Sequence, residues 1–217
     1  MKVLVDCEYS GQVREAFRAQ GHEAWSCDLL PADDGSPFHV QGDVLDQLDK
    51  GWDLMVAHPP CTYLTSSGLH WNKKVPGREL KTLEALEFVR QLMGAPIPRI
   101  AMENPVGRIS TAIDAREYGF RTAKATQYVQ PFEFGSDASK KTGLWLKNLP
   151  DLAPTEYVEP RWVDGKPRWS NQTDSGQNRL GPSEDRWKLR SDTFTGIAQA
   201  MADQWGPHIQ RQIANVA

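Results

Sequence analysis

Short apolar runs that end close to a polar residue recur along the first half of the chain. They occupy residues 1–6, 23–28, 52–57 and 99–105. Each has the length and composition of a buried strand in a parallel sheet. Between them, Val13, Ala16 and Phe17 repeat at helical spacing, and leucines do the same over residues 78–93. The pattern predicts strands that alternate with helices.

Such alternation is typical of a doubly wound, mostly parallel α/β sheet. In this fold class, ligands bind at the carboxyl ends of the strands. The residues at the predicted ends are polar or reactive: Asp6, Asp28, Asp43, residues 58–61 and residues 103–105. The sequence therefore predicts a site along one edge of the sheet.

The second half of the chain does not continue this regular alternation. Residues 127–135 and 142–146 are predicted strands around a polar loop, and residues 193–205 are a predicted helix. Residues 154–190 have no periodicity and are rich in Trp, Arg, Asn, Gln and Pro. This stretch is predicted to be irregular.

Length and composition indicate one main domain. The 217 residues are 39% hydrophobic and 24% charged, as in soluble globular proteins. We predict a catalytic α/β domain formed by residues 1–150 and 191–217. Residues 151–190 are then a small segment for target recognition or nucleic-acid contact.

No apolar run approaches the roughly 20 residues that a membrane-spanning helix needs, and no signal-peptide pattern follows Met1. Three cysteines without an export signal, Cys7, Cys27 and Cys61, are typical of thiols in a reducing compartment. We expect a cytoplasmic protein with no membrane partner, and we assume a monomer.

The formal net charge of −3 conceals an asymmetry. Residues 1–60 carry 4 basic and 11 acidic residues, whereas residues 61–150 carry 13 basic and 8 acidic ones. This division suits a first part that binds a cationic small molecule and a middle part that faces a polyanion. Scattered surface charge would explain it equally well.

The first turn and the following strand ends are typical of a nucleotide-type pocket. Gly11 lets a ligand approach the backbone, Asp28 can accept hydrogen bonds from both ribose hydroxyls, and Asp43 is placed to meet an adenine amino group. The turn has one glycine and no following lysine, which disfavours NAD and ATP. A phosphate-free adenosyl ligand is favoured, although three ordinary surface acids would produce the same pattern.

A thiol and a carboxylate follow neighbouring predicted strands. Cys61 comes directly after Pro59-Pro60, which hold its thiol at the rim of the sheet. Glu103 ends the next long strand, about one βαβ unit later, and is expected beside that thiol. Together they suit covalent attack on a heteroaromatic ring whose nitrogen is protonated or hydrogen-bonded. The chain has no CxxC, no HExxH and no histidine pair at ligand spacing, so no metal is expected.

The residues around this pair resemble those of the C5-cytosine DNA methyltransferases. The family's Pro-Cys and Glu-Asn-Val motifs are similar to residues 57–62 (Ala-His-Pro-Pro-Cys-Thr), with residues 66–68, and to residues 102–105 (Met-Glu-Asn-Pro). Nearly the whole chain also resembles short cytosine methyltransferase-like proteins of phages and prophages. This second resemblance rests on residues 131–135, 144–147 and 200–206.

The resemblance implies a Rossmann-like fold of the S-adenosylmethionine-dependent methyltransferase type and transfer of a methyl group to C5 of cytosine in DNA. It implies that Cys61 attacks C6, that Glu103 hydrogen-bonds or protonates N3, and that Asn104 helps to hold the base. The implied cofactor-binding residues are Asp6, Glu8, Gly11, Asp28, Asp43 and Pro59, with the choice between Asp6 and Glu8 as ligand left open. The base would be flipped out of a duplex or supplied single-stranded.

The chain departs from this family in several places. Residues 7–11 (Cys-Glu-Tyr-Ser-Gly) stand where the family has a phenylalanine and several glycines. Thr62 replaces a glutamine, and Pro105 replaces a valine. Lys140 and Lys141 stand where the family has paired arginines.

Basic and aromatic residues are interleaved in the aperiodic segment. This mixture suits phosphate contacts combined with stacking on bases. The candidate DNA-binding residues are Lys140, Lys141, Arg161, Arg168, Trp169 and Arg179. A solvated loop, with its tryptophans in the core of a small subdomain, would explain the same composition.

Other functions remain open. The small recognition segment would suit methyl transfer to free nucleotides or RNA. Transfer to an exocyclic amine would treat residues 58–60 as a variant of the Asp/Asn-Pro-Pro-aromatic motif, although position 61 is not aromatic. The glycine-poor first turn would suit a non-catalytic nucleic-acid-binding protein with a methyltransferase-like core.

Overall fold

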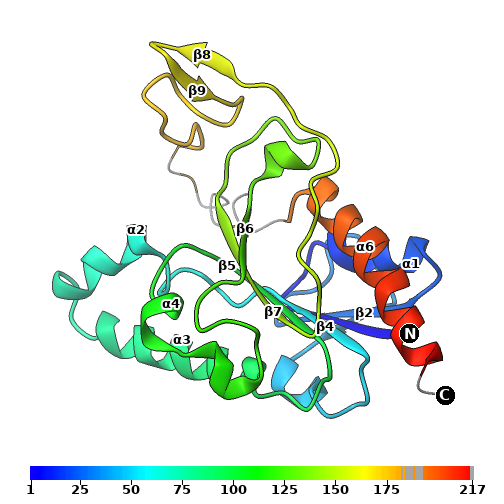
Figure 1. Ribbon diagram of the computed structural model, residues 1–217. Helices are drawn as coiled ribbons and strands as arrows, with labels where there is room; N and C mark the ends of the chain where they lie inside the picture. Colours follow the sequence, from blue (N-terminus) through cyan, green and yellow to red (C-terminus); the bar gives the residue numbers. More distant parts are fainter. Residues whose placement is uncertain (182, 184–187, 189–192, 216–217) are drawn as a thin grey trace.

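The computed structural model describes residues 1–181, 183, 188 and 193–215. Its centre is a seven-stranded sheet in the order β3-β2-β1-β4-β5-β7-β6 (Figure 1). The strands are β1 (Lys2–Asp6), β2 (Glu23–Asp28), β3 (His39–Gln41), β4 (Leu54–Ala57), β5 (Ile100–Pro105), β6 (Gln127–Val129) and β7 (Thr142–Lys147). Strands β1 to β5 pair in parallel, whereas β7 is antiparallel to both β5 and β6.

Helices cover both faces of the sheet (Figure 1). One face carries α1 (Gln12–Ala19) and α6 (Thr195–Ala214), and the other carries α3 (Arg78–Met93) and α4 (Ile109–Ala112). The shorter elements are α2 (Ser66–Leu69) and four 3₁₀ turns: η1 (Val44–Gln47), η2 (His70–Lys73), η3 (Ala115–Tyr118) and η4 (Pro131–Glu133). The predicted α/β class with a doubly wound, mostly parallel sheet is confirmed. None of the helices described is long and apolar enough to cross a bilayer.

The apolar runs of the sequence exist because both faces of the sheet are buried. In β1, Val3 and Val5 belong to the core beneath α1 and α6, whereas Leu4 belongs to the core beneath α3. Side chains alternate between the two faces of a strand, so a strand covered on both sides needs apolar residues at every position. This explains why the runs show no alternation with polar residues.

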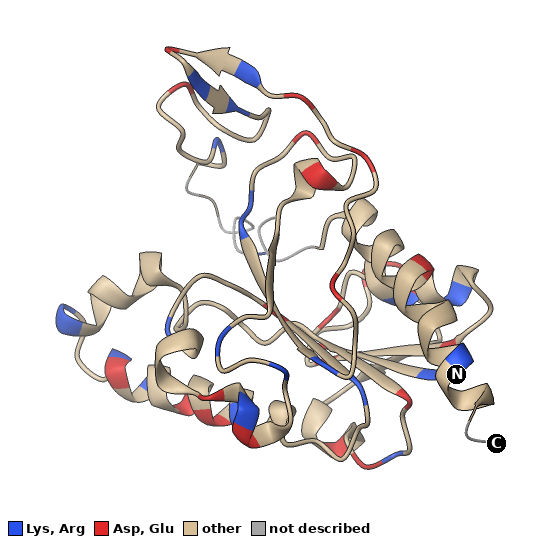
Figure 2. Ribbon diagram, in the orientation of Figure 1, with Lys and Arg blue, Asp and Glu red and all other residues tan. Residues whose placement is uncertain are grey.

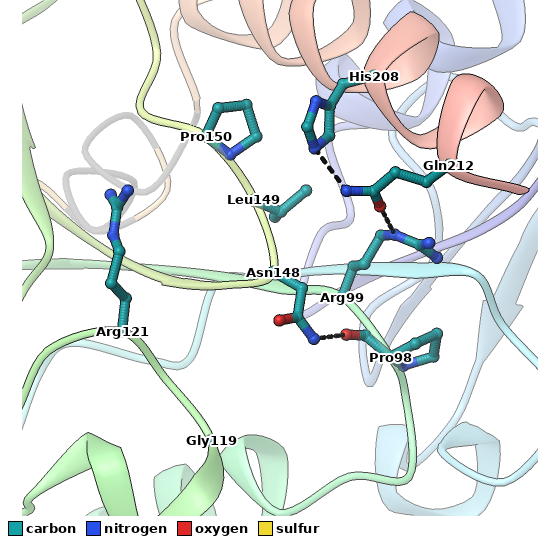
Figure 3. Close-up of a pocket in the computed structure, with 9 residues that line it drawn as sticks. All are labelled: Pro98, Arg99, Gly119, Arg121, Asn148, Leu149, Pro150, His208 and Gln212. Carbon is teal, nitrogen blue, oxygen red and sulfur yellow. Dashed lines mark hydrogen bonds between the residues drawn. The ribbon is translucent and has the colours of Figure 1, made fainter. Parts of the chain in front are cut away.

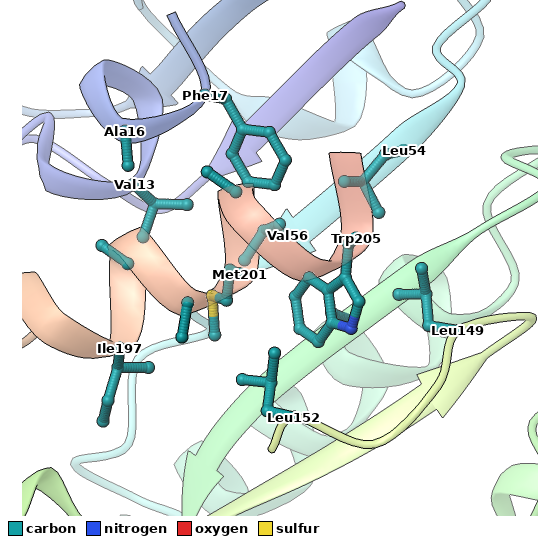
Figure 4. Packing of buried hydrophobic residues seen from close by; sticks show 14 of the residues in the cluster. Val13, Ala16, Phe17, Leu54, Val56, Leu149, Leu152, Ile197, Met201 and Trp205 are labelled. Carbon is teal, nitrogen blue, oxygen red and sulfur yellow. The ribbon is translucent and has the colours of Figure 1, made fainter. Parts of the chain in front are cut away.

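Helix α6 completes the first of these cores. Its residues Ile197, Met201 and Trp205 lie against α1 and the sheet (Figure 4). The sequence predicts that this helix ends at residue 205, but it continues through Pro207 to Ala214. Ile209 is fully buried, so the last turns gain apolar burial that offsets the backbone hydrogen bond lost at the proline.

The aperiodic segment contains a two-stranded hairpin, β8 (Arg161–Val163) and β9 (Lys166–Arg168). The hairpin projects from the body of the molecule (Figure 1). It is anchored by Trp169, whose ring stacks on Phe132 with centroids 4.0 Å apart. The predicted domain boundary at residues 190 and 191 lies outside the described residues.

Candidate functional site

The carboxyl ends of β1, β4 and β5 lie side by side at one edge of the sheet. Asp6 of β1 pairs with Ala57 of β4, and Ala57 pairs with Met102 of β5. The residues that follow on β4 and β5 meet there, because His58 Nδ1 lies 3.6 Å from Glu103 Oε2. The backbone N–H of His58 also donates to the Asp6 carboxylate, at 3.2 Å. The polar groups predicted at these strand ends are therefore brought together.

Burial and mutual charge together set the ionisation of His58 and Glu103. Burial would lower the pKa of His58, but the hydrogen bond and charge of Glu103, helped by Glu8 and Asp6, raise it above its ordinary value. Burial would raise the pKa of Glu103, but His58 and Lys140 bring it below its ordinary value. Both shifts favour an imidazolium that faces a carboxylate.

The sequence places His58 among the polar or reactive residues 58–61 at a predicted strand end, but nothing in it links His58 with Glu103. The contact depends on the register of β4 against β5, which no local pattern specifies. The one available signal is that His58 and Glu103 each lie near the end of an apolar run, and that these two runs become the neighbouring strands β4 and β5.

The loop that carries Cys61 follows β4 after two prolines and forms a tight turn. The carbonyl oxygen of Cys61 accepts two backbone N–H groups, both at 3.0 Å, and its side chain is partly exposed. The side-chain amide of Asn104, near the end of β5, donates to the carbonyl oxygen of Pro59 at 2.7 Å. This hydrogen bond ties the Cys61 loop to the strand that carries Glu103.

A second connection joins the Cys61 loop to the chain that follows β5. The N–H of Arg108 donates to the carbonyl oxygen of Leu64 at 2.7 Å, and Thr65 forms a β-bridge with Gly107. A Cβ at position 107 would collide with the Leu64 carbonyl, so the two segments approach this closely only because residue 107 is glycine. Sequence reasoning overlooked Gly107, although a glycine directly after the Glu-Asn-Pro-Val run could have signalled a close approach.

Asp6 supplies a polar atom that the described residues leave unsatisfied. Its side chain is fully buried, and one carboxylate oxygen accepts the N–H of His58. The other oxygen, Oδ2, has no hydrogen-bond partner in the part of the chain that the structure describes. Burial raises the pKa of Asp6 to about 7, and His58 opposes this shift. An unpaired buried acceptor is costly, so Oδ2 fits a hydrogen-bond donor or cation of a bound molecule.

Glu8 and Gly11 shape the turn between β1 and α1. The two carboxylate oxygens of Glu8 accept the N–H groups of Val13, at 2.6 Å, and Arg14, at 3.2 Å. Glu8 therefore satisfies N–H groups at the start of α1. Gly11 has a φ of 74°, and a Cβ there would collide with the Arg14 guanidinium. Both carboxylate oxygens of Glu8 are thus engaged by the helix, whereas Asp6 Oδ2 has no partner among the described residues. Which of the two acids contacts a ligand stays a prediction.

Asp28 and Asp43 lie on the same edge, after β2 and β3. Asp28 Oδ1 accepts the N–H of Leu30 at 2.9 Å, and burial raises the pKa of Asp28. Asp43 is exposed and caps η1 by accepting the N–H of Leu45 at 2.9 Å. Their place on the Asp6 edge is compatible with the predicted adenosyl site. Their contact with a ligand stays a prediction.

The candidate DNA-binding residues form two groups. Lys140 and Lys141 precede β7, where Lys140 lowers the pKa of Glu103 and Lys141 is exposed. Arg161, Arg168 and Arg179 lie in and after the hairpin, and each donates to a backbone carbonyl of the same segment. Figure 2 shows basic residues on both hairpin strands and on the loop before β7. Their contact with DNA stays a prediction.

The structure corrects the part expected of Trp169. Its ring stacks on Phe132, its indole N–H donates to the Val158 carbonyl at 3.1 Å, and only 8% of the residue is exposed. Trp169 is thus a core residue of the small segment, and its faces are not open to a base. Trp162 on β8 is 67% exposed and presents its ring to solvent.

A cavity of about 600 Å³ opens elsewhere, beside the start of β5 (Figure 3). Its lining groups bond one another, since Arg99 donates to Gln212 at 2.8 Å and Gln212 contacts His208 at 2.9 Å. The lining contains none of the predicted site residues. Over residues 1–181, 183, 188 and 193–215, no His, Cys, Asp or Glu side chains cluster as a metal site would require.

No protein-family model and no curated protein matches the chain. It is similar in structure to a prophage-encoded E. coli protein described as a DNA modification methyltransferase, at 14% identity and a TM-score of 0.48, over 73% of this chain and 52% of that one. It is also similar to the Dnmt2 methyltransferase of S. pombe, at 14% identity and a TM-score of 0.43, over 70% and 51%. A TehB-like SAM-dependent methyltransferase from Corynebacterium glutamicum matches at 18% identity and a TM-score of 0.36, over 67% and 79%. The chain thus spans about half the length of the first two proteins. At these identities the similarity concerns the course of the chain alone.

Proposed function

We propose that this protein transfers a methyl group from S-adenosylmethionine to C5 of cytosine in DNA. One observation carries the proposal: the Cys61 loop follows β4, Glu103 lies on the neighbouring β5, and the Asn104–Pro59 hydrogen bond ties the loop to that strand. The sequence resemblance adds the chemistry of a thiol that attacks the base and a carboxyl group that binds its ring nitrogen.

The proposed cofactor fits the acidic side of the site. Asp6 offers a buried oxygen without a partner among the described residues, which suits a cationic or hydrogen-bond-donating group. Gly11 would border the ligand at the turn, and Asp28 and Asp43 would receive the ribose and adenine. Pro59 would border the same pocket. Bound there, S-adenosylmethionine would supply an electrophilic methyl group beside the base.

The chain's own residues then activate the base. The Cys61 thiolate attacks C6 while Glu103 binds N3, and this turns C5 into a nucleophile. Asn104 holds the Cys61 loop through Pro59 and so fixes where the thiol stands relative to the carboxyl group. After methyl transfer, loss of the proton at C5 and elimination of the thiolate release the product. None of these groups can reach a base inside a duplex, so the substrate base must be extruded or single-stranded.

The test is to replace Cys61 with alanine. We expect the variant to fold and to bind S-adenosylmethionine, but to form no 5-methylcytosine, because it lacks the thiol proposed to add to C6. The measurement is mass spectrometry of nucleosides from DNA incubated with the purified protein. Cys27→Ala is the matched control, since that thiol is buried within β2 and should be dispensable. Full product formation by Cys61→Ala would contradict the mechanism.

A second candidate function is methyl transfer to free nucleotides or RNA. The observation that favours it is the size of the recognition segment, whose described strands β8 and β9 have three residues each. Parallel assays with duplex DNA, single-stranded DNA, RNA and dCMP separate the candidates. A preference for RNA or dCMP would replace DNA as the substrate. A calorimetric titration without any S-adenosylmethionine binding would instead support a non-catalytic nucleic-acid-binding protein.

A further inference from the structure

His58 lies on the side of Glu103 that faces β4, within the buried edge of the sheet. Its Nδ1 is 3.6 Å from Glu103 Oε2, and the two side chains are 9% and 18% exposed. Its other ring nitrogen, Nε2, is buried and has no hydrogen-bond partner among the described residues. The imidazole thus has one nitrogen committed to Glu103 and one unsatisfied. A histidine needed only for packing would not require this arrangement.

We propose that His58 is a positioning residue that supplies the proton which Glu103 passes to the ring nitrogen of the base. The inference rests on the proposed function, because it assigns the source of that proton. An ionised Glu103 can accept hydrogen bonds but has no proton to give. An imidazolium in contact with it can renew the proton each time the carboxyl group delivers one.

The charged groups around His58 favour this role. Glu103 faces it from β5, Asp6 from β1 and Glu8 from the turn after β1, and all three stabilise its positive charge. On the other side of the pair, Lys140 acts on Glu103 and opposes protonation of that carboxyl group in the absence of substrate. The proton is therefore held on His58 until a base takes it through Glu103.

The step balances in atoms and charge. The imidazolium of His58 passes its proton to the ionised Glu103 and becomes neutral. As the Cys61 thiolate forms its bond to C6, electrons move through the ring to N3, which takes this proton from Glu103 and leaves the carboxylate ionised again. After C5 has gained the methyl group and lost its proton to solvent, the C6–S bond breaks and restores the thiolate. The N3 proton then returns through Glu103 to His58.

The test is the pH profile of kcat for the wild type and His58→Gln with a DNA substrate. In the wild type, kcat should fall as pH rises through the elevated pKa of His58, because the pair then has no proton. In His58→Gln, this fall in kcat on the alkaline side of the profile (the alkaline limb) should begin at least one pH unit lower. At pH 8, kcat should be at least tenfold below that of the wild type, while KM for DNA is unchanged. His208→Gln, at the opposite edge of the sheet, should keep the wild-type profile.

Each outcome has a distinct meaning. A uniform loss of kcat at every pH, with the limb unmoved, would overturn the inference and leave the proposed function standing. A wild type that methylates no nucleic acid at any pH would overturn the proposed function, and the inference with it.

A second measurement avoids dependence on the folding of one variant. NMR titration of the five histidines should place the midpoint of His58 above its ordinary value and lower it in Glu103→Gln. If the titration midpoint of His58 is the same in Glu103→Gln as in the wild type, the inference is overturned.

Discussion

Three individual residues at the strand ends carry buried polar atoms that lack a hydrogen bond within the described chain. Asp6 Oδ2, His58 Nε2 and Asn104 Oδ1 are buried without a hydrogen-bond partner among the described residues. They come from three adjacent strand ends, β1, β4 and β5. Buried polar atoms are nearly always paired in native proteins, so these three atoms are candidates for contact with a ligand.

Asp6 makes a prediction about stability and pH. Its pKa is raised by burial from 3.8 to about 7, so between these values the folded protein keeps a proton that the unfolded chain has lost. Stability therefore falls as pH rises through this window and levels off above it. Asp6→Asn lacks the titration, and its stability relative to the wild type should increase by about 2 kcal/mol from pH 5.5 to pH 8.

Urea denaturation of the ligand-free proteins at the two pH values measures this difference. Asp43→Asn is the control, because it removes an exposed carboxylate near the same strand ends. Equal stability differences for Asp6→Asn at both pH values would show that burial does not keep Asp6 protonated.

Among the helices and strands, the alternation of buried strands with covering helices follows from patterns in the sequence. The strand order and the antiparallel direction of β7 do not. Apolar runs without alternation predicted strands buried on both faces, and the structure has them. The end of α6 was harder to predict, because Pro207 is a local stop signal that the burial of Ile209 overrides. The predicted strand over residues 127–135 is also shorter, since Pro131 begins η4 after β6 has ended.

A further prediction concerns the contact between the Cys61 loop and the chain after β5. Gly107→Ala would place a methyl group in collision with the Leu64 carbonyl. Only a movement of the backbone, in the Cys61 loop or in the chain after β5, could relieve this collision. We expect a loss of about 1–3 kcal/mol in the free energy of unfolding, together with lower methyl transfer, because the thiol shifts relative to Glu103. Gly42→Ala is the control for stability, because nothing lies within 4 Å of a Cβ placed there. Equal stability of the two variants would contradict this account.

In the molecule as a whole, acidic and basic side chains lie in different regions. The acidic residues of the first 60 positions include those at the β1 and β2 ends, whereas the hairpin and the loop before β7 carry basic residues (Figure 2). A cationic methyl donor and a polyanionic substrate would each meet a surface of opposite charge. If the protein acts on DNA as proposed, the projecting hairpin would give the nucleic acid a second point of contact beyond the carboxyl ends of the strands.

Trp162 tests that contact. Its exposed ring on β8 can stack on a base, and stacking of this kind contributes about 1–3 kcal/mol per base. Trp162→Ala should therefore weaken DNA binding about 5- to 150-fold without changing the unfolding temperature. Fluorescence anisotropy with a labelled oligonucleotide measures the affinity. Leu83→Ala, an equally exposed apolar position on α3, should bind as the wild type does. If Trp162→Ala also binds normally, the hairpin is not the contact.

The sequence by itself determined the fold class, the edge of the sheet that collects polar groups, and the candidates Cys61, Glu103 and Asp6. These follow from local order, because an apolar run and the residue that ends it are adjacent in the chain. The tertiary structure was needed to show that His58 faces Glu103 and that Trp169 is buried. Each of these depends on strand register or on packing between distant segments, and no local pattern records either one.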